Sequence, residues 1–154
     1  LPSLIERTGT SSKSGGTITA IYTVLADGDD VTSDPVVDTA RAILDGHIVL
    51  SRDLAQQGIY PAIDVSQSVS RLMTDIVSTE QTQNSQLLRK YISKYYENRD
   101  LILMGGYVQG QDTDLDVAMQ LWPSIVNFLK QNDGELASFS DSAEALKNLI
   151  GMNK

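Results

Sequence analysis

The chain has 154 residues, of which 41% are hydrophobic, so it can bury the core of one domain, or of one domain with a small appendage. Its 20 acidic and 12 basic side chains give a formal net charge of -8, which argues against a surface built to neutralise nucleic-acid phosphates. Because there is no cysteine, a disulfide framework and a thiolate metal site are both excluded.

The sequence contains no secretory signal and no apolar run of membrane-spanning length. The simplest compartment is therefore the cytoplasm. The chain opens on Leu1 instead of a methionine, and it reads as if it begins partway through a fold. We expect it to be part of a longer protein, with its own chemistry incomplete.

The first 50 residues have the pattern of an α/β fold. Residues 10–16 are polar and glycine-rich, which predicts a flexible loop. Residues 17–25 are rich in β-branched side chains and nearly apolar at their end, which predicts a strand buried on both faces. Asp34 suits a helix N-cap and Pro35 suits the first helical position, so a helix is expected from there until Gly46.

Residues 48–50, Ile-Val-Leu, predict a second short buried strand after this helix. A strand, a helix and a strand over this length form a βαβ unit. We therefore expect the two strands to be parallel and joined by a right-handed crossover.

After about residue 72 the pattern changes to helices only, which predicts a domain boundary near residues 71–75. One helical face is formed by apolar side chains at helical spacing: Leu87, Leu88, Tyr91, Ile92 and Tyr95. Residues 101–104 form a short apolar run that ends at Gly105 and Gly106.

The remaining sequence predicts further helices. Residues 115–122 begin one, and Pro123 is expected to start a new segment because proline disrupts a helix interior. For the last helix, Asp141 with Glu144 three residues later predicts a capping box.

Three groups of residues offer chemistry and also have a plainer interpretation. The loop at residues 9–16 has neither the spacing nor the order of a phosphate-binding Walker A loop, and a surface loop is the simpler interpretation. Asp112, Asp114 and Asp116 begin like a calcium loop but lack its glycine and its final glutamate, so we expect them to serve a helix N-terminus. His47 is the sole histidine and lacks catalytic partners, which favours a structural role.

For two further residues, the sequence leaves the choice between a packing role and a functional role open. Tyr60 precedes Pro61, which holds the ring in an extended segment where it either packs or stacks on a flat ligand. Arg71 ends the segment Ser68-Val69-Ser70 and, by itself, is either a solvated cation or an ion-pair partner.

Four blocks of sequence carry a family resemblance. They are residues 1–9, residues 17–30, residues 42–52 (Ala-Ile-Leu-Asp-Gly-His-Ile-Val-Leu-Ser-Arg) and residues 58–71 (Gly-Ile-Tyr-Pro-Ala-Ile-Asp through Ser-Val-Ser-Arg). In this order they resemble the catalytic subunits of the hexameric rotary and type III secretion ATPases, most closely the flagellar export ATPase. The implied fold is α/β: the C-terminal part of a RecA-like P-loop ATPase core over residues 1–72, with parallel strands and a crossover helix. An all-α helical domain follows over residues 73–154.

The resemblance implies roles for four residues. Tyr60 stacks on adenine, and Arg71 reaches a neighbouring subunit's active site as an arginine finger. Asp29 and Asp30 belong to a loop that contacts a central stalk. ATP with Mg²⁺ is the implied cofactor, but the Walker A and B residues that bind it lie upstream of this chain, so no metal ligand is assigned here. The chain alone is expected to be inactive.

The implied protein is an ATPase that forms a homohexamer and powers protein export through the flagellar type III secretion apparatus. It is cytoplasmic and peripheral at the inner-membrane export apparatus. Its implied partners are other copies of itself, stalk and regulatory proteins, export chaperones with their substrates and the membrane export gate, with no nucleic acid.

Three alternatives remain. The chain is a non-catalytic docking module for chaperone-substrate complexes, a virulence-type (injectisome) secretion ATPase, or a subunit like the β subunit of ATP synthase. The segment Leu121-Trp122-Pro123 followed by Phe128-Leu129 looks more like flagellar members than injectisome ones.

Overall fold

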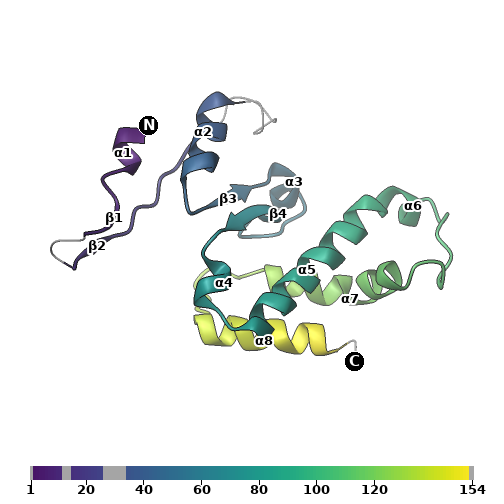
Figure 1. The fold of residues 1–154 in the computed structure, drawn as a ribbon. Helices are drawn as coiled ribbons and strands as arrows, with labels where there is room; N and C mark the ends of the chain where they lie inside the picture. Colours follow the sequence, from purple (N-terminus) through teal and green to yellow (C-terminus); the bar gives the residue numbers. More distant parts are fainter. Residues whose placement is uncertain (1, 12–14, 26–33, 153–154) are drawn as a thin grey trace. The chain divides into compact units, whose positions relative to one another are not determined.

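The computed structural model describes residues 2–11, 15–25 and 34–152, which fall into two compact units, Leu1–His47 and Ile48–Lys154 (Figure 1). The elements in chain order are α1 (Pro2–Ile5), β1 (Gly9–Thr10), β2 (Thr17–Ile18), α2 (Pro35–Ile43), β3 (Gly46–Leu50), α3 (Arg52–Gln56), β4 (Ile63–Ser70), α4 (Met73–Ile76), α5 (Thr79–Glu97), α6 (Arg99–Leu103), α7 (Thr113–Leu129) and α8 (Phe139–Gly151). Across these described ranges, no helix combines the length and the apolar character needed to cross a membrane.

The first unit contains a small hairpin. Strands β1 and β2 pair antiparallel, with Gly9 opposite Ile18 and Thr10 opposite Thr17. The backbone N–H of Ser11 donates to the carbonyl of Gly16 at 2.8 Å and closes the turn. The predicted loop at residues 10–16 is therefore a hairpin connection, and its tip, residues 12–14, lies outside the described residues.

The strand predicted over residues 17–25 is wrong in length and in burial. Only Thr17 and Ile18 are in strand conformation, and Ile21 and Leu25 are 93% and 91% exposed. A strand buried on both faces needs strands at its edges and helices over both faces. Among the described residues of this unit, β2 has only the two-residue strand β1 beside it.

Helix α2 begins as predicted. The carboxylate of Asp34 accepts from the backbone N–H groups of Val36 (2.7 Å) and Val37 (3.3 Å), and Pro35 occupies the first turn, where its missing N–H costs nothing. The helix buries Val37 and Ala40. It ends at Ile43, and Gly46 already belongs to β3.

Strands β3 and β4 pair with each other. A hydrogen bond from the N–H of Ser51 to the carbonyl of Ala62 (2.8 Å) joins the end of β3 to the start of β4. The predicted parallel pair between residues 17–25 and 48–50 is not among the strand pairs of the described residues. Burial in β3 alternates, because Val49 is covered whereas Ile48 and Leu50 are each 71% exposed, so this strand is buried on one face only.

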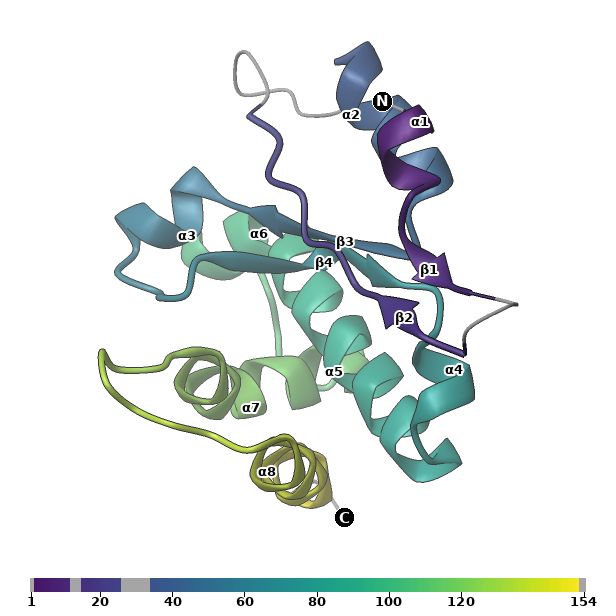
Figure 2. The ribbon, with the colours of Figure 1, turned by 90° about the vertical axis from the view of Figure 1, so that its left-hand side faces the viewer.

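Helix α5 is the central element of the second unit. It contacts β4 on one side and α7 and α8 on the other (Figure 2). The predicted apolar face is confirmed, because Leu88, Tyr91 and Ile92 are buried and Leu87 and Tyr95 pack beside them. The core of the unit is completed by six buried side chains from the other two helices: Ala118, Leu121, Ile125, Leu146, Leu149 and Ile150.

The predicted helix break at Pro123 is wrong, because α7 continues through it to Leu129. Proline in a helix interior costs about 3 kcal/mol. Leu121 and Ile125, which lie on either side of Pro123, are both buried, and a buried side chain of this kind contributes about 1.5–3 kcal/mol. The core contacts therefore hold the helix together across the proline.

The capping box of α8 lies three residues before the predicted one. Ser138 is the N-cap and Asp141 is its partner, with the Ser138 N–H donating to the Asp141 carboxylate and the Asp141 N–H donating to the Ser138 hydroxyl at 3.1 Å. Asp141 and Glu144 have the same spacing, but Phe139 already lies inside the helix. By contrast, the predicted end of the 101–104 run is confirmed, because Gly105 has a φ of 68° that favours glycine.

The predicted domain boundary after residue 72 stays a prediction. The compact units divide near residue 47 instead, since β4 packs on α5 and groups with the helices.

Replacing Ile125 by alanine tests the core. Ile125 is 0% exposed at the contact of α7 with α5, so Ile125→Ala is expected to lower the free energy of unfolding by about 2–5 kcal/mol. The matched control Leu50→Ala removes a side chain that is 71% exposed and should change it by less than about 0.5 kcal/mol. Urea unfolding monitored by circular dichroism measures both; equal effects would contradict this core assignment.

Candidate functional site

Arg71 follows directly after β4 and is exposed. The strand that carries it is fixed by its own polar side chains. The Asp64 carboxylate accepts from the N–H groups of Ser66 (2.9 Å) and Gln67 (3.0 Å). The Ser68 hydroxyl donates to the Asp64 carbonyl (2.6 Å) and accepts from the N–H of Val49 in β3 (3.0 Å). The polar residues of this segment thus set the shape of the strand that leads to Arg71.

Tyr60 lies in the loop between α3 and β4, and its side chain is 57% exposed. Its neighbour Ile59 is buried and donates its N–H to the carbonyl of Leu54 at 2.9 Å, which anchors the loop. The Tyr60 carbonyl accepts from the N–H of Gln131, just beyond α7, at 2.8 Å. The backbone at Tyr60 is therefore held on two sides while its ring faces solvent.

Tyr60 and Arg71 lie beyond opposite ends of β4. The segment between them is not fully extended, because the Ser68 hydroxyl reaches the Asp64 carbonyl, four residues earlier, at 2.6 Å. The two predicted site residues therefore flank a bent strand.

Asp29 and Asp30, the predicted stalk-contact residues, lie outside the described residues. The loop at residues 9–16 joins two antiparallel strands, whereas a phosphate-binding loop joins a strand to a helix. The described part of this segment therefore fits the interpretation as a surface loop.

The three acidic residues 112, 114 and 116 serve the start of α7, as predicted. Asp112 is its N-cap and accepts from the N–H groups of Asp114 (2.9 Å) and Leu115 (3.2 Å). Asp114 pairs with Lys90 at 2.7 Å, and Asp116 accepts from the Tyr107 hydroxyl at 2.8 Å. Within the described ranges, no three His, Cys, Asp or Glu side chains are grouped so that they could hold a metal ion.

Asp112 also joins α7 to α5. Lys94 donates to its carboxylate at 2.9 Å, and this hydrogen bond, with the backbone N–H of Leu115, lowers the pKa of Asp112 below its usual value. The same contact raises the pKa of Lys94. Burial and the hydrogen bond to Asp116 raise the pKa of Tyr107. These shifts belong to a structural network that fixes the loop between α6 and α7.

His47 lies in β3 and is half-buried. This position fits the structural role predicted for it, which stays a prediction.

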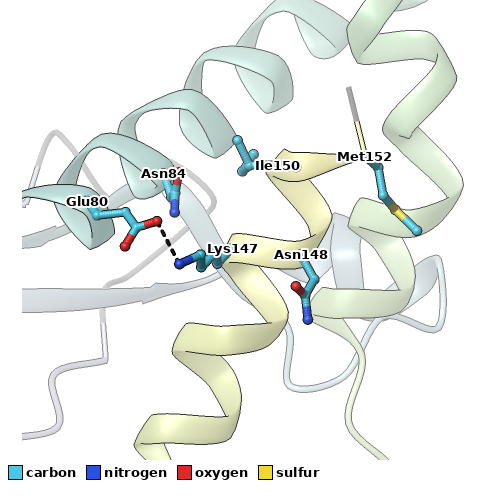
Figure 3. Close-up of a pocket in the computed structure, with 7 residues that line it drawn as sticks. Glu80, Asn84, Lys147, Asn148, Ile150 and Met152 are labelled. Atoms are coloured by element: carbon cyan, nitrogen blue, oxygen red, sulfur yellow. Dashed lines mark ion pairs between the residues drawn. The ribbon is translucent and has the colours of Figure 1, made fainter. Parts of the chain in front are cut away.

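Two cavities in the second unit have linings that include neither Tyr60 nor Arg71. One, of about 440 Å³, lies between α5 and α8, where Lys147 pairs with Glu80 at 2.9 Å beside Asn84 and Asn148 (Figure 3). The other, of about 400 Å³, lies between α3, β4, α5 and α7 and has Tyr96 and Trp122 in its wall. Neither cavity is lined by Tyr60 or Arg71, so the predicted nucleotide contacts are surface features of this chain.

The sequence interpretation missed two contacts that the structure makes at these residues. Gln131 holds Tyr60, and the guanidinium of Arg89 in α5 donates to the Ser68 carbonyl at 2.7 Å. One sequence feature could have indicated a contact by Arg89. It lies three residues before the core residue Ile92 and so borders the apolar face of α5. Nothing in the sequence pattern links Arg89 to β4.

Two family models match the chain. The ATP synthase alpha/beta family, nucleotide-binding domain, matches residues 1–70, and the T3SS EscN ATPase C-terminal domain matches residues 77–148. Residues 1–70 belong to the ATP synthase alpha/beta family, and residues 77–148 belong to the C-terminal domain of the type III secretion ATPases. The resemblance and the fold class predicted from the sequence, an ATPase-core part followed by a helical domain, are confirmed by these matches.

Relatives in this family match nearly all of the chain. It is 49% identical over 146 residues to the flagellum-specific ATP synthase of Salmonella typhimurium, covering 95% of this chain and 32% of that protein. The assembled ATPase EscN of the enteropathogenic E. coli type III secretion system superposes with a TM-score of 0.90 at 40% identity, covering 97% of this chain and 35% of EscN. EscN in complex with its central stalk EscO gives a TM-score of 0.84 at 38% identity over 97% of this chain and 34% of that one. The chain thus spans about a third of the length of these relatives.

Acidification tests the contact between Asp112 and Lys94. Because the pKa of Asp112 is lower in the folded chain than its usual 3.8, its contribution to stability is complete above that value and is lost as the pH falls below it. Asp112→Asn should therefore lower the urea midpoint at about pH 6 and should differ less from the parent at about pH 3.

The matched control repeats Asp112→Asn in a Lys94→Met background, where the main cause of the pKa shift is absent. There the difference between the two pH values should shrink. A midpoint difference that is independent of pH in the parent background would contradict the assignment.

Proposed function

We propose that residues 1–154 form the C-terminal part of an ATPase that hydrolyses ATP to drive protein export through the flagellar type III secretion apparatus. The observation that carries the proposal is the 49% identity to a flagellum-specific ATP synthase across 95% of the chain. The exposure of Tyr60 and Arg71 supports it, because both side chains are accessible to a nucleotide or to a neighbouring copy.

Two of the three rival interpretations have less support. Identity to the injectisome ATPase EscN is 40%, lower than the 49% to the flagellar relative, and this favours the flagellar branch. The match of residues 77–148 to a type III secretion domain argues against a subunit of the proton-translocating ATP synthase.

Tyr60 provides the adenine contact. Its ring is exposed on a loop that Ile59 and Gln131 hold in place, so a flat base can stack on it without rearrangement of the backbone. Stacking of this kind fixes the orientation of the nucleotide and leaves the phosphates to be bound by other residues.

Arg71 acts on the nucleotide of a neighbouring copy. Its delocalised cation stabilises the charge that spreads over the γ-phosphate oxygens, and such fingers supply on the order of a thousand-fold to a hundred-thousand-fold in rate. Because Arg71 acts across the contact between two copies, activity depends on assembly of a ring, which we propose to contain six copies. The phosphate-binding lysine and the residues that bind Mg²⁺ belong to other parts of the protein, so the isolated chain is inactive.

Further partners follow from the same proposal. Asp29 and Asp30 contact a central stalk, in line with the relative EscN, whose structure has been solved with its central stalk EscO. The protein is cytoplasmic and binds peripherally at the inner-membrane export apparatus, where it meets regulatory proteins, chaperones with their substrates and the export gate.

A second function, docking of chaperone-substrate complexes, is favoured by the apolar tip of the helical part. Leu103, Met104 and Val108 are 72%, 78% and 61% exposed. The loop that presents them is fixed, because the Asp116 carboxylate accepts from the Tyr107 hydroxyl (2.8 Å) and from the N–H of Gly110 (2.9 Å). An exposed apolar surface on a fixed loop is a frequent form of protein interaction site.

Removing the guanidinium of Arg71 tests the ATPase proposal. In the full-length protein, ATP turnover should rise with protein concentration as the ring assembles, and Arg71→Ala should reduce turnover by about a hundred-fold or more without loss of assembly. Arg41→Ala, which removes an arginine of α2 to which the proposal gives no role, is the control. Normal turnover by Arg71→Ala would refute the finger assignment.

Pull-down of export chaperones by residues 48–154, which form one compact unit, tests the docking function. Polar substitution of Leu103, Met104 and Val108 together should abolish capture by this unit, because burial of these three side chains supplies the proposed contact. Substitution of Ile76 and Leu136, which are also exposed, should leave capture intact. Failure of the unaltered unit to capture any export chaperone would remove this function.

A further inference from the structure

We propose that Arg89 is a positioning residue for Arg71, an inference that rests on the proposed function. The guanidinium of Arg89 donates from Nη2 to the backbone carbonyl of Ser68 at 2.7 Å. Ser68 precedes Arg71 by three residues in the strand that delivers it. Arg89 thus joins the central helix of the second unit directly to the base of the finger.

Both the side-chain hydroxyl and the backbone carbonyl of Ser68 are hydrogen-bonded. Its hydroxyl accepts from the N–H of Val49 (3.0 Å) and donates to the Asp64 carbonyl (2.6 Å), which fixes its side chain to β3 and to its own strand. Its carbonyl accepts from Arg89. A hydrogen bond from a charged donor is stronger and shorter than a neutral one, so the contact with α5 holds the last part of β4 in place.

The chain between Ser68 and Arg89 forms a closed loop. After Arg71 it runs through α4, which contacts α5, and Ser78 caps α5 by accepting from the N–H of Gln81 at 3.2 Å. The hydrogen bond from Arg89 closes this loop 21 residues after Ser68. Arg71 therefore lies in a segment between β4 and α5, and these two elements are hydrogen-bonded to each other.

The position of the finger consequently depends on α5. Leu88 and Ile92 bury α5 against α7 and α8, so a displacement of these helices reaches Ser68 through Arg89. A misplacement of about 1 Å at a catalytic group costs about a hundred-fold in rate. The contact gives the helical part of the chain a direct way to set the activity of the neighbouring copy's site.

The test uses variants of the full-length, assembled ATPase. Arg89→Met keeps the packing of the side-chain stem but removes the donor, Arg89→Lys keeps one charged donor group, and Arg89→Gln keeps an uncharged one. Lys90→Ala is the matched control, because Lys90 neighbours Arg89 on α5 but pairs with Asp114 of α7 instead of β4. Arg71→Ala is measured alone and combined with Arg89→Met.

We expect Arg89→Met to lower kcat by about tenfold or more while KM for ATP changes by less than about twofold, since a finger acts on the transition state. Arg89→Lys should recover part of kcat, and Lys90→Ala should match the parent. In the Arg71→Ala background, Arg89→Met should cause no further loss, because residues that act as one unit are not additive. A purely structural role would instead change both backgrounds equally.

Different results separate the two proposals. Normal turnover by Arg71→Ala refutes the proposed function and this inference with it. Reduced turnover by Arg71→Ala, with Arg89→Met either unaffected or additive, refutes this inference alone. If Arg89→Met does not assemble, the comparison of Arg89→Lys with Arg89→Gln decides: equal kcat values for these two would also overturn it.

Discussion

Burial of one face of α5 is the interaction on which the rest of the second unit depends. Leu88, Tyr91 and Ile92 from this helix meet Ala118, Leu121 and Ile125 from α7, and α8 closes the group with Leu146, Leu149 and Ile150. A fully buried aliphatic or aromatic side chain of this kind contributes about 1.5–3 kcal/mol. Trp122 adds a ring stacked on Tyr95 at a centroid distance of 3.7 Å. This interface also keeps α7 continuous at Pro123.

Burial of the apolar face of α5 places its basic side chains next to other elements. Arg89 reaches β4, whereas Lys90 and Lys94 reach the first turn of α7. A single helix therefore orients both the strand that ends at Arg71 and the loop that carries Leu103, Met104 and Val108. Because the two basic contacts to α7 are largely exposed, they orient the loop more than they stabilise the fold.

The proposed site is incomplete in one copy of the chain. Tyr60 precedes β4 and Arg71 follows it. Exposure of both side chains is expected if they act at an interface, as we propose. Neither of the two cavities described above is lined by them. The proposed catalysis by two copies would link ATP turnover to assembly.

The sequence by itself determined the local features and the family. Asp34 with Pro35 defined the start of α2, the spacing of Leu88, Tyr91 and Ile92 defined the buried face of α5, and the segment from Tyr60 to Arg71 identified the type of ATPase. These features depend on neighbouring residues, on backbone chemistry or on motif spacing, all of which are visible along the chain.

Tertiary structure decided what depends on distant neighbours. Residues 17–25 have the composition of a buried strand, but a strand is buried only by the strands and helices around it, and here Ile21 and Leu25 are exposed. Pro123 remains helical because core contacts on both sides outweigh its local cost. The hydrogen bond from Arg89 to Ser68 joins residues 21 positions apart, and only the packing of α5 on β4 brings them within reach. Local sequence specifies which groups are available, whereas packing decides which of them meet.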